Sequence, residues 1–329
     1  MSEEIEIVFN DGIDVLGWTQ LLSECEQPSF FQSPKGYQLL KTFHQWEVGA
    51  VGCLINGQLR AVLVFVVQKE KGVKAFFSKR CIIFSGPIYT NELALRSILS
   101  ALEKVSKGSV YLEIRNGHPN QTVFDLYKEL GWEYIPWLNF IVDTKEDKKM
   151  QQQISESRKR QLKKAEKNGV LVTNPKSESE VKEFYQILKE LYQTKIKKPL
   201  PDYELFSAFF HADTRNIILV IWNNKVIGGI LAPFLEGVGA YEFYIAGLDQ
   251  AYRDCFPSAM ATYGAMKQAN ALGLRFFDFM GGGSPSESYG VREFKSRFGG
   301  EQVESGRWLK VNRKFIYQLG KFYFQMKSR

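Results

Sequence analysis

The chain has 329 residues, of which 44% are hydrophobic and 14% aromatic, so it can bury sizeable cores and is not an intrinsically disordered protein. A formal net charge of +7 mildly favours an anionic partner. Four scattered cysteines without a CxxC pair, and three histidines without ligand spacing, argue against a metal site. The acidic start MSEEIEIVF lacks a signal-peptide pattern and no run of about 18 apolar residues occurs, which favours a cytoplasmic protein.

The first half of the chain begins with a set of hairpins. Residues 51–87 predict three strands, separated by turns at 56–57 and near 71–72. The segment NELALRSILSALEKVSKG then has the pattern of an amphipathic helix, with Asn91 as a suitable N-cap and Gly108 as a stop signal. A strand in SVYLEIRN, a helix in TVFDLYKEL and a final aromatic strand complete this half.

The second half repeats the same order of elements. Residues 215–247 predict three strands with turns at 223–224 and 237–239, and alternation along the third strand places Glu242 and Tyr244 on one face. FPSAMATYGAMKQANALG predicts a helix, with Pro257 in its first turn. The strand LRFFDFM, the segment VREFKSRFGGE and a closing strand around GRWLKV follow.

The repeated order indicates an internal duplication. Each half is an antiparallel hairpin set followed by helix and strand crossovers, which predicts an α+β, mixed α/β class with two tandem domains. We expect residues 1–145, completed by a C-terminal helix at 314–329, to form the first domain. Residues 146–313 would form the second domain and carry the GGG and FK motifs.

Asp278 ends the apolar strand LRFFDFM and shares a face with Leu274 and Phe276. A carboxylate among apolar residues is costly unless it is paired or placed at a strand end that faces a site. The glycines at 281–283 let the backbone approach a ligand closely. Asp278 is therefore a candidate catalytic residue that lines a site, or it only holds the shape of the glycine segment, or it does both, and these interpretations stay open.

The order of elements resembles the GNAT acyltransferase unit, with Tyr127 four residues before Gly131-Trp132 in the first half. Two such units in tandem, the second carrying FDFMGGG and YGVREFKSRFGGE, resemble the FemABX family, and specifically its shorter, FemX-type members without a coiled-coil arm. The resemblance covers most of the chain. It implies GNAT-like domains and an aminoacyltransferase that moves an amino acid from aminoacyl-tRNA to an amine of a peptidoglycan precursor, with no separate cofactor.

Aligning the two halves on Gly131 and Gly299 places Lys295 opposite Tyr127. A GNAT tyrosine at this place is associated with protonating the thiolate of coenzyme A. A fixed ammonium instead stabilises negative charge on an ester carbonyl and its leaving oxygen, by about 2.7–4 kcal/mol in comparison with oxyanion donors. The resemblance implies this catalytic role for Lys295, beside Phe294. The alternative is a solvated lysine on an amphipathic helix.

Other functions remain open. The segment YRDCFPSAM lacks the glycine-rich pyrophosphate loop of coenzyme A users, which argues against acetyl-CoA as donor. Thr90 stands where the family has an aspartate, which puts a nucleotide-linked precursor in doubt and slightly favours an acyl-CoA-dependent N-acyltransferase acting on a cell-envelope sugar or lipid-linked saccharide. A third interpretation is a basic protein that binds tRNA or precursor without turnover.

Several residues are candidate substrate contacts. Two come from the basic helix SRKRQLKKAEK, and the others come from strands, loops and the FFQSPKGYQLL segment. The candidates are Lys35, Tyr37, Tyr89, Arg158, Arg160, Glu242, Tyr244, Gly281, Gly282 and Phe294. The tail RKFIYQLGKFYFQMKSR either packs its aromatics on the first domain, the simpler interpretation, or makes peripheral contact with the inner face of an anionic membrane.

Overall fold

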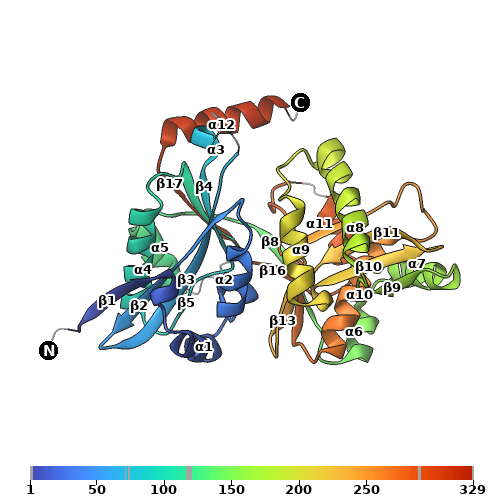
Figure 1. Cartoon of the computed structure of the whole chain (residues 1–329), viewed down its shortest axis with the longest axis horizontal. Coiled ribbons are helices and arrows are strands. Elements are labelled where there is room, and N and C mark those ends of the chain that lie inside the picture. The colour runs from blue at the N-terminus through green and yellow to red at the C-terminus, as the bar shows by residue number, and fades with distance from the viewer. Residues whose placement is uncertain (1–2, 71, 73–74, 116–120, 288–289, 328–329) are drawn as a thin grey trace. The chain divides into compact units, whose positions relative to one another are not determined.

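The computed structural model describes residues 3–70, 72, 75–115, 121–287 and 290–327 (Figure 1). The chain divides into two compact units: unit 1 is Met1–Trp137 with Glu304–Arg329, and unit 2 is Leu138–Val303. Each unit combines helices with mixed or antiparallel sheets, which confirms the expected α+β class. No helix in the described part of the chain is long and apolar enough to cross a membrane.

Unit 1 is built on one sheet in the order β1-β2-β3-β4-β6-β17-β7, with β5 paired to β3. Its strands are β1 (Ile5–Phe9), β2 (Glu47–Ile55), β3 (Gln58–Gln68), β4 (Arg80–Phe84), β5 (Ile88–Tyr89), β6 (Tyr111–Arg115), β7 (Glu133–Ile135) and β17 (Arg307–Val311). Its helices are α1 (Val15–Glu24), α2 (Pro34–Lys41), α3 (Ala75–Ser78), α4 (Glu92–Val105), α5 (Gln121–Glu129) and α12 (Lys314–Lys327), with 3-10 turns at Asn10–Gly12 and Phe30–Gln32.

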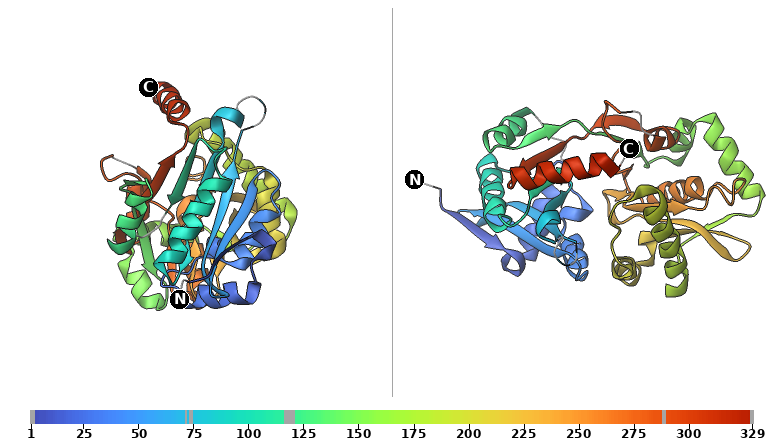
Figure 2. Two further views of the ribbon diagram at one scale, coloured as in Figure 1. Left: turned by 90° about the vertical axis from the view of Figure 1, so that its left-hand side faces the viewer. Right: turned by 90° about the horizontal axis from the view of Figure 1, so that it is seen from above.

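Local signals in the sequence explain much of unit 1. Asn56 and Gly57 both have positive φ, as a two-residue hairpin turn between β2 and β3 requires. The Asn91 side chain accepts a hydrogen bond from Ala94 N at 3.1 Å and caps α4, which ends at Val105. Alternate β2 residues contribute to the core beneath α4, which lies across one face of the sheet (Figure 2, left). Lys71, part of the second expected turn, lies outside the described residues.

Unit 2 contains a sheet in the order β14-β11-β10-β9 and a second sheet in the order β12-β13-β15-β8-β16. Its strands are β8 (Leu138–Asp143), β9 (Leu171–Thr173), β10 (Ile217–Trp222), β11 (Lys225–Leu231), β12 (Phe234–Leu235), β13 (Gly239–Tyr241), β14 (Tyr244–Gly247), β15 (Phe276–Asp278) and β16 (Glu301–Glu304). Its helices are α6 (Asp147–Gln153), α7 (Glu156–Lys167), α8 (Glu178–Leu191), α9 (Tyr203–Ala212), α10 (Pro257–Ala271) and α11 (Gly290–Ser296).

Consecutive glycines in β11 let helices approach both faces of its sheet. A Cβ at Gly228 would lie 3.0 Å from Pro257 of α10, and a Cβ at Gly229 would lie 2.9 Å from the Phe184 ring of α8. Because neighbouring strand residues point to opposite faces, both helices need a glycine at their contact with β11. α10 is thereby held against the strands that carry the candidate site.

The two halves of the sequence exchange one strand each. β8 ends the first half of the sequence but pairs with β15 of unit 2, and β17 ends the second half but lies between β6 and β7 of unit 1. The expected boundaries at 145/146 and 313/314 therefore differ from the observed divisions after Trp137 and Val303. The reason is that the boundary at 145/146 follows β8, which pairs in unit 2, and the boundary at 313/314 follows β17, which pairs in unit 1.

The third strand of the second half is interrupted. β13 ends at Tyr241 and β14 begins at Tyr244, so Glu242 and Phe243 lie between two strands. The prediction that alternation places Glu242 and Tyr244 on one face of a continuous strand is wrong. The interruption has a structural cause, because β13 pairs in parallel with β15 whereas β14 pairs with β11 in a different sheet.

Candidate active site

Two parallel strands separate at the candidate site. The last register pair of β13 and β15 joins Tyr241 to Asp278, and Glu242 N then donates to Asp278 O at 2.8 Å. Beyond this point one chain continues beside β11, while the other turns into the glycine segment. Glu242 and Asp278 lie at this divergence, only 5% and 6% exposed.

Lys295 of α11 reaches the same place and is 7% exposed. Its Nζ donates to Phe279 O at 2.6 Å and to Gly281 O at 2.9 Å, and forms an ion pair with Glu242 Oε1 at 2.8 Å. An ammonium has three hydrogens, so these three oxygens use all of its donors. Lys295 is therefore a buried, fully coordinated cation, and the alternative of a solvated surface lysine is excluded.

Glu242 keeps one oxygen unused. Its Oε2 makes no hydrogen bond within the described part of the chain. The nearby Thr262 hydroxyl does not reach hydrogen-bond geometry, but its presence has a small lowering effect on the pKa of the Glu242 carboxyl. Burial raises the pKa of the Glu242 carboxyl above its usual range, against the opposing effect of the Lys295 ammonium. A buried carboxylate with a raised pKa and a free lone pair can accept a proton from a bound substrate.

Asp278 shapes the glycine segment. Its Oδ1 accepts hydrogen bonds from Asn139 Nδ2 at 2.7 Å and Met280 N at 2.6 Å, and Asn139 Oδ1 accepts one from Gly281 N at 2.7 Å. Met280, Gly281 and Gly283 all have positive φ, so this turn is held in a conformation that needs such support. These contacts favour the shape-holding interpretation of Asp278.

The other end of the glycine segment is fixed by Arg292, a residue that the sequence pattern alone did not indicate. Its guanidinium donates to Gly282 O and Glu287 O, each at 2.9 Å, and to Ser284 O. Arg292 stands three residues before Lys295 on α11, a spacing that places both side chains toward one side of a helix. That spacing is the feature of the sequence from which a role for Arg292 beside Lys295 could have been predicted. Asn139 gave no such signal, since it belongs to the exchanged strand β8.

Arg158 of α7 packs against α11 and the residues that follow it. It is 4% exposed, and its guanidinium carbon lies 4.6 Å from the ring centroids of both Phe294 and Phe298. It donates to Phe294 O at 3.3 Å and Gln161 Oε1 at 2.8 Å, and burial lowers its pKa to about 10. The prediction that Arg158 contacts substrate is wrong, because the side chain is buried against two rings. Phe294 is correspondingly a packing residue, and Arg160 is exposed on α7.

Tyr244 belongs to a cluster of aromatic side chains. Its ring packs against Phe206 at 5.5 Å, Phe243 at 4.7 Å and Tyr192 at 6.3 Å. The aromatic cluster between β14, α9 and the segment after α8 explains this tyrosine as a packing residue.

The candidates from the first half all lie in unit 1. Tyr37 is 1% exposed and packs on Trp18 with ring centroids 5.6 Å apart, so it belongs to the core and does not contact substrate. Lys35 is exposed in the first turn of α2, which Ser33 caps by accepting from Gly36 N at 3.0 Å. Tyr89 is half-buried against the unit 1 core, and Thr90 beside it lines a cavity of about 190 Å³.

The first turn of α10 is occupied by a carboxylate of the chain itself. Asp249 Oδ1 accepts from Ser258 N at 3.1 Å, and Oδ2 accepts from the Ser258 hydroxyl. Pro257 in the same turn supplies no N–H donor. In GNAT enzymes that use coenzyme A, a glycine-rich loop before this helix binds the pyrophosphate. Here Ser258 N already donates to Asp249, and the negative charge of that carboxylate disfavours a second anion at this turn.

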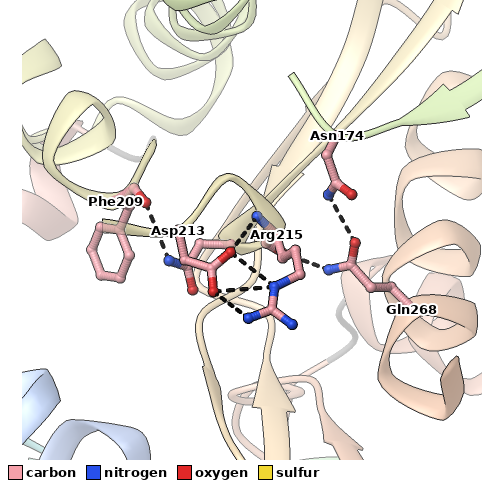
Figure 3. A network of polar contacts seen from close by, with 6 residues as sticks. Asn174, Phe209, Asp213, Arg215 and Gln268 are labelled. Carbon is pink, nitrogen blue, oxygen red and sulfur yellow. Dashed lines mark hydrogen bonds and ion pairs between the residues drawn. The ribbon is translucent and has the colours of Figure 1, made fainter. Parts of the chain in front are cut away.

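A separate polar network joins α10 to the start of β10 (Figure 3). Asn174 Nδ2 donates to Gln268 Oε1 at 2.8 Å, Gln268 Nε2 donates to Arg215 O at 2.5 Å, and Arg215 forms an ion pair with Asp213 at 2.7 Å. Its charges are paired within the network. We therefore regard it as support for α10, whose Gln268 also borders a cavity of about 310 Å³.

Comparisons with known proteins agree with this fold. Residues 153–296 match the family described as acetyltransferase (GNAT) domain. The structure of FemX has a TM-score of 0.70 at 16% identity, covering 95% of this chain and 99% of FemX.

Two other structures share the fold. L-PGS from Bacillus licheniformis has a TM-score of 0.56 at 13% identity, covering 91% of this chain and 92% of that chain. A tandem GNAT protein from the clavulanic acid biosynthesis pathway has a TM-score of 0.58 at 8% identity, covering 94% and 99%. No curated protein matches the chain at a significant level.

Proposed function

We propose that this chain, which has the tandem GNAT fold, is a FemABX-like acyltransferase that transfers an amino acid from aminoacyl-tRNA to an amine of a peptidoglycan precursor. The observation that carries the proposal is the buried Lys295–Glu242 pair at the divergence of β13 and β15. It combines a fixed positive charge with a carboxylate that has an unused oxygen. Both groups can accelerate an aminolysis reaction, the cation by stabilising the developing negative charge and the carboxylate by accepting a proton.

The amine of the acceptor attacks the ester carbonyl of the aminoacyl-tRNA. A C–N bond forms, and negative charge develops on the carbonyl oxygen, which the Lys295 ammonium stabilises. Glu242 Oε2 takes the proton that the amine loses. When the C–O bond to the ribose breaks, the ribose oxygen recovers that proton, so neither charge nor protons are left over.

Lys295 acts through its charge in this scheme. Its three hydrogens are held by Phe279 O, Gly281 O and Glu242, so it donates directly to substrate only by giving up one of these oxygens. Gly281 lies in the glycine segment, where a small change of backbone would free one donor. Asp278 and Arg292 are positioning residues, because they hold that segment and touch no reacting atom in the scheme.

Aminoacyl-tRNA is favoured as donor by the occupied first turn of α10, where Asp249 disfavours a pyrophosphate. A further neighbour of the fold is named as a putative lysylphosphatidylglycerol synthetase, which is in keeping with an aminoacyl group as cargo. Arg160, Lys163 and Lys167 are exposed on α7 and would contact phosphates of the tRNA or precursor. In this scheme aminoacyl-tRNA is a co-substrate, so the reaction requires no cofactor. Because the reaction depends on tRNA, we propose a cytoplasmic location.

One alternative has specific support. The family that matches residues 153–296 is described as an acetyltransferase domain. Thr90 stands where the FemABX resemblance implies an aspartate, so acetyl-CoA with a cell-envelope sugar or lipid-linked saccharide is the second candidate. Asp249 and Pro257 count against it, since they leave the first turn of α10 poorly suited to a pyrophosphate.

The test is a mass-spectrometric transfer assay with the full chain. Nucleotide-linked and lipid-linked precursors are offered with a pool of charged tRNAs, and in parallel with acetyl-CoA. We expect a mass gain of one amino-acid residue that ribonuclease abolishes. We expect Lys295→Met and Glu242→Gln each to reduce the rate at least about 100-fold. Lys149→Met, which removes an exposed lysine paired with Glu146, is the matched control and should retain the rate.

Each result discriminates between the candidates. Acetyl transfer from the coenzyme A arm alone would replace the proposal with the alternative. Full activity of Lys295→Met would contradict the role of the buried cation. Tight tRNA or precursor binding without any transfer would instead favour a binding protein.

A further inference from the structure

Helix α12 presents large apolar side chains on its outer side. Phe315 is 77% exposed, Leu319 49% and Phe322 63%. Their spacing of four and three residues places them on one face of the helix. The opposite side is the packed one, where the Tyr317 ring contacts Tyr111 with centroids 5.5 Å apart. The expectation that the tail packs its aromatics on the first domain therefore holds for Tyr317 but not for Phe315 or Phe322.

The neighbouring helix α3 also exposes apolar side chains. Phe76 and Phe77 of α3 are 58% and 56% exposed. The Arg313 guanidinium, immediately before α12, lies 4.7 Å from the centroid of the Phe76 ring, so the two helices are neighbours, as the ribbon also shows (Figure 1). We call Phe76, Phe77, Phe315, Leu319 and Phe322 the α3–α12 surface. Single exposed apolar residues are ordinary, but a group of five on adjacent helices indicates an interaction site.

The charge around the α3–α12 surface is positive. The sequence from 305 to 329 contains no acidic residue. Its basic residues at this surface are Arg313, whose guanidinium lies over the Phe76 ring, and Lys314 and Lys321 of α12. Lys314 and Lys321, seven residues apart, lie together along one edge of the apolar stripe. The acidic neighbours that influence the helix, Glu113 and Glu133, act on Tyr317 on the packed side.

We propose that the α3–α12 surface docks on an anionic lipid bilayer, with α12 lying in the plane of the interface. Aromatic and leucine side chains enter the boundary between headgroups and acyl chains, and the flanking lysines contact anionic headgroups. Charge decides between this occupant and a second copy of the chain, since two surfaces of the same positive sign repel one another. In the view from above, α12 lies nearest the viewer over unit 1 (Figure 2, right).

This inference does not rest on the transfer chemistry, so lipid binding and catalysis can be tested separately. The full chain is centrifuged with vesicles of phosphatidylglycerol and phosphatidylcholine in equal parts, and with vesicles of phosphatidylcholine alone. We expect binding to the anionic vesicles that weakens with added salt. Phe315→Ser/Leu319→Ser/Phe322→Ser should lower the partition coefficient at least about 30-fold, because the apolar contribution is lost.

A charge variant and a control accompany the triple variant. Lys314→Gln/Lys321→Gln should lower anionic binding about 25-fold, or about fivefold for each lysine. Leu16→Ser/Leu171→Ser removes two leucines that are 81% and 63% exposed elsewhere, and should bind like the unaltered chain.

Three outcomes would overturn the proposal. The first is binding that does not depend on anionic lipid, and the second is equal loss in the Leu16→Ser/Leu171→Ser control. The third is a dimer in light scattering that the triple variant converts to a monomer without any change in lipid binding.

Discussion

Removing the Lys295 ammonium isolates a buried carboxylate. In Lys295→Met, Glu242 stays at 5% exposure without its cation, and Phe279 O and Gly281 O lose their donor. Breaking one side of a buried ion pair costs about 3–5 kcal/mol. For a unit of this size, 1 kcal/mol shifts the midpoint by about 2–4 °C, so the Tm of unit 2 should fall by about 6–20 °C.

The assay is urea unfolding of Lys295→Met, Glu242→Gln and the double variant, combined as a double-mutant cycle. Glu242→Gln keeps the shape but removes the negative charge, and should also destabilise because it leaves the ammonium without a counter-charge. In the double variant neither charge remains. We therefore expect it to be more stable than Lys295→Met, with a coupling free energy of at least about 2 kcal/mol.

The pH dependence gives an independent check. The Glu242 carboxyl has a raised pKa, so the folded state binds its proton more tightly than the unfolded chain does. Stability from this group is present at low pH and is lost as the pH rises through the folded-state value. Lys295→Met removes a charge that lowers the pKa of Glu242. The loss of unfolding free energy in Lys295→Met should therefore become smaller as the pH is reduced, because Glu242 then takes up a proton and loses its charge. A pH-independent deficit, or one under about 1 kcal/mol, would refute the buried pair.

Three further predictions concern other parts of the fold. Asp249→Ala should lower the unfolding free energy by about 1 kcal/mol, because Ser258 N loses its acceptor in the first turn of α10; unchanged stability in urea would contradict this. Gly306→Ala should cost about 3 kcal/mol, since its φ is +64° and a Cβ would overlap the Tyr134 ring, whereas Gly57→Ala, in open space at φ +75°, should cost only about 1 kcal/mol. Burial raises the pKa of the Glu113 carboxyl, but the guanidinium groups of Arg115 and Arg307 outweigh burial, so the pKa is lowered. The stability that the Glu113 carboxylate contributes is therefore lost as the pH falls below about 4.5. Thermal unfolding of Glu113→Gln should show a smaller loss of Tm at acidic pH than the unaltered chain does.

Much of the local structure was predictable. The hairpin turns at 56–57 and 223–224 have the positive φ that their residues favour, and the Asn91 cap and Pro257 helix start lie where expected. These features depend on residues a few positions apart, which is why the sequence indicates them directly. The duplication was visible for the same reason, because it repeats such local signals in order.

The candidate site was predictable only in part. The pattern around Lys295 and Asp278 indicated a cation and a carboxylate near the glycine segment, and both lie there. The sequence did not indicate that Arg158 is buried against the rings of Phe294 and Phe298. In the sequence Arg158 looks like the other basic residues of its helix, most of which are exposed. The sequence also did not indicate that the Glu242 chain breaks between two sheets, since alternation assumes one continuous strand.

The exchange of strands was decided by the tertiary structure. Asn139 of β8 supports Asp278 in unit 2, and Arg307 of β17 pairs with Glu113 in unit 1 at 2.9 Å. In each case a carboxylate on a central strand is paired with a side chain from the exchanged strand. The sequence alone determined the turns, the caps, the periodicity and the repeat, because each is set by neighbouring residues. Which strand completes which sheet depends on pairing and burial between residues more than 130 positions apart, and this only the folded chain determines.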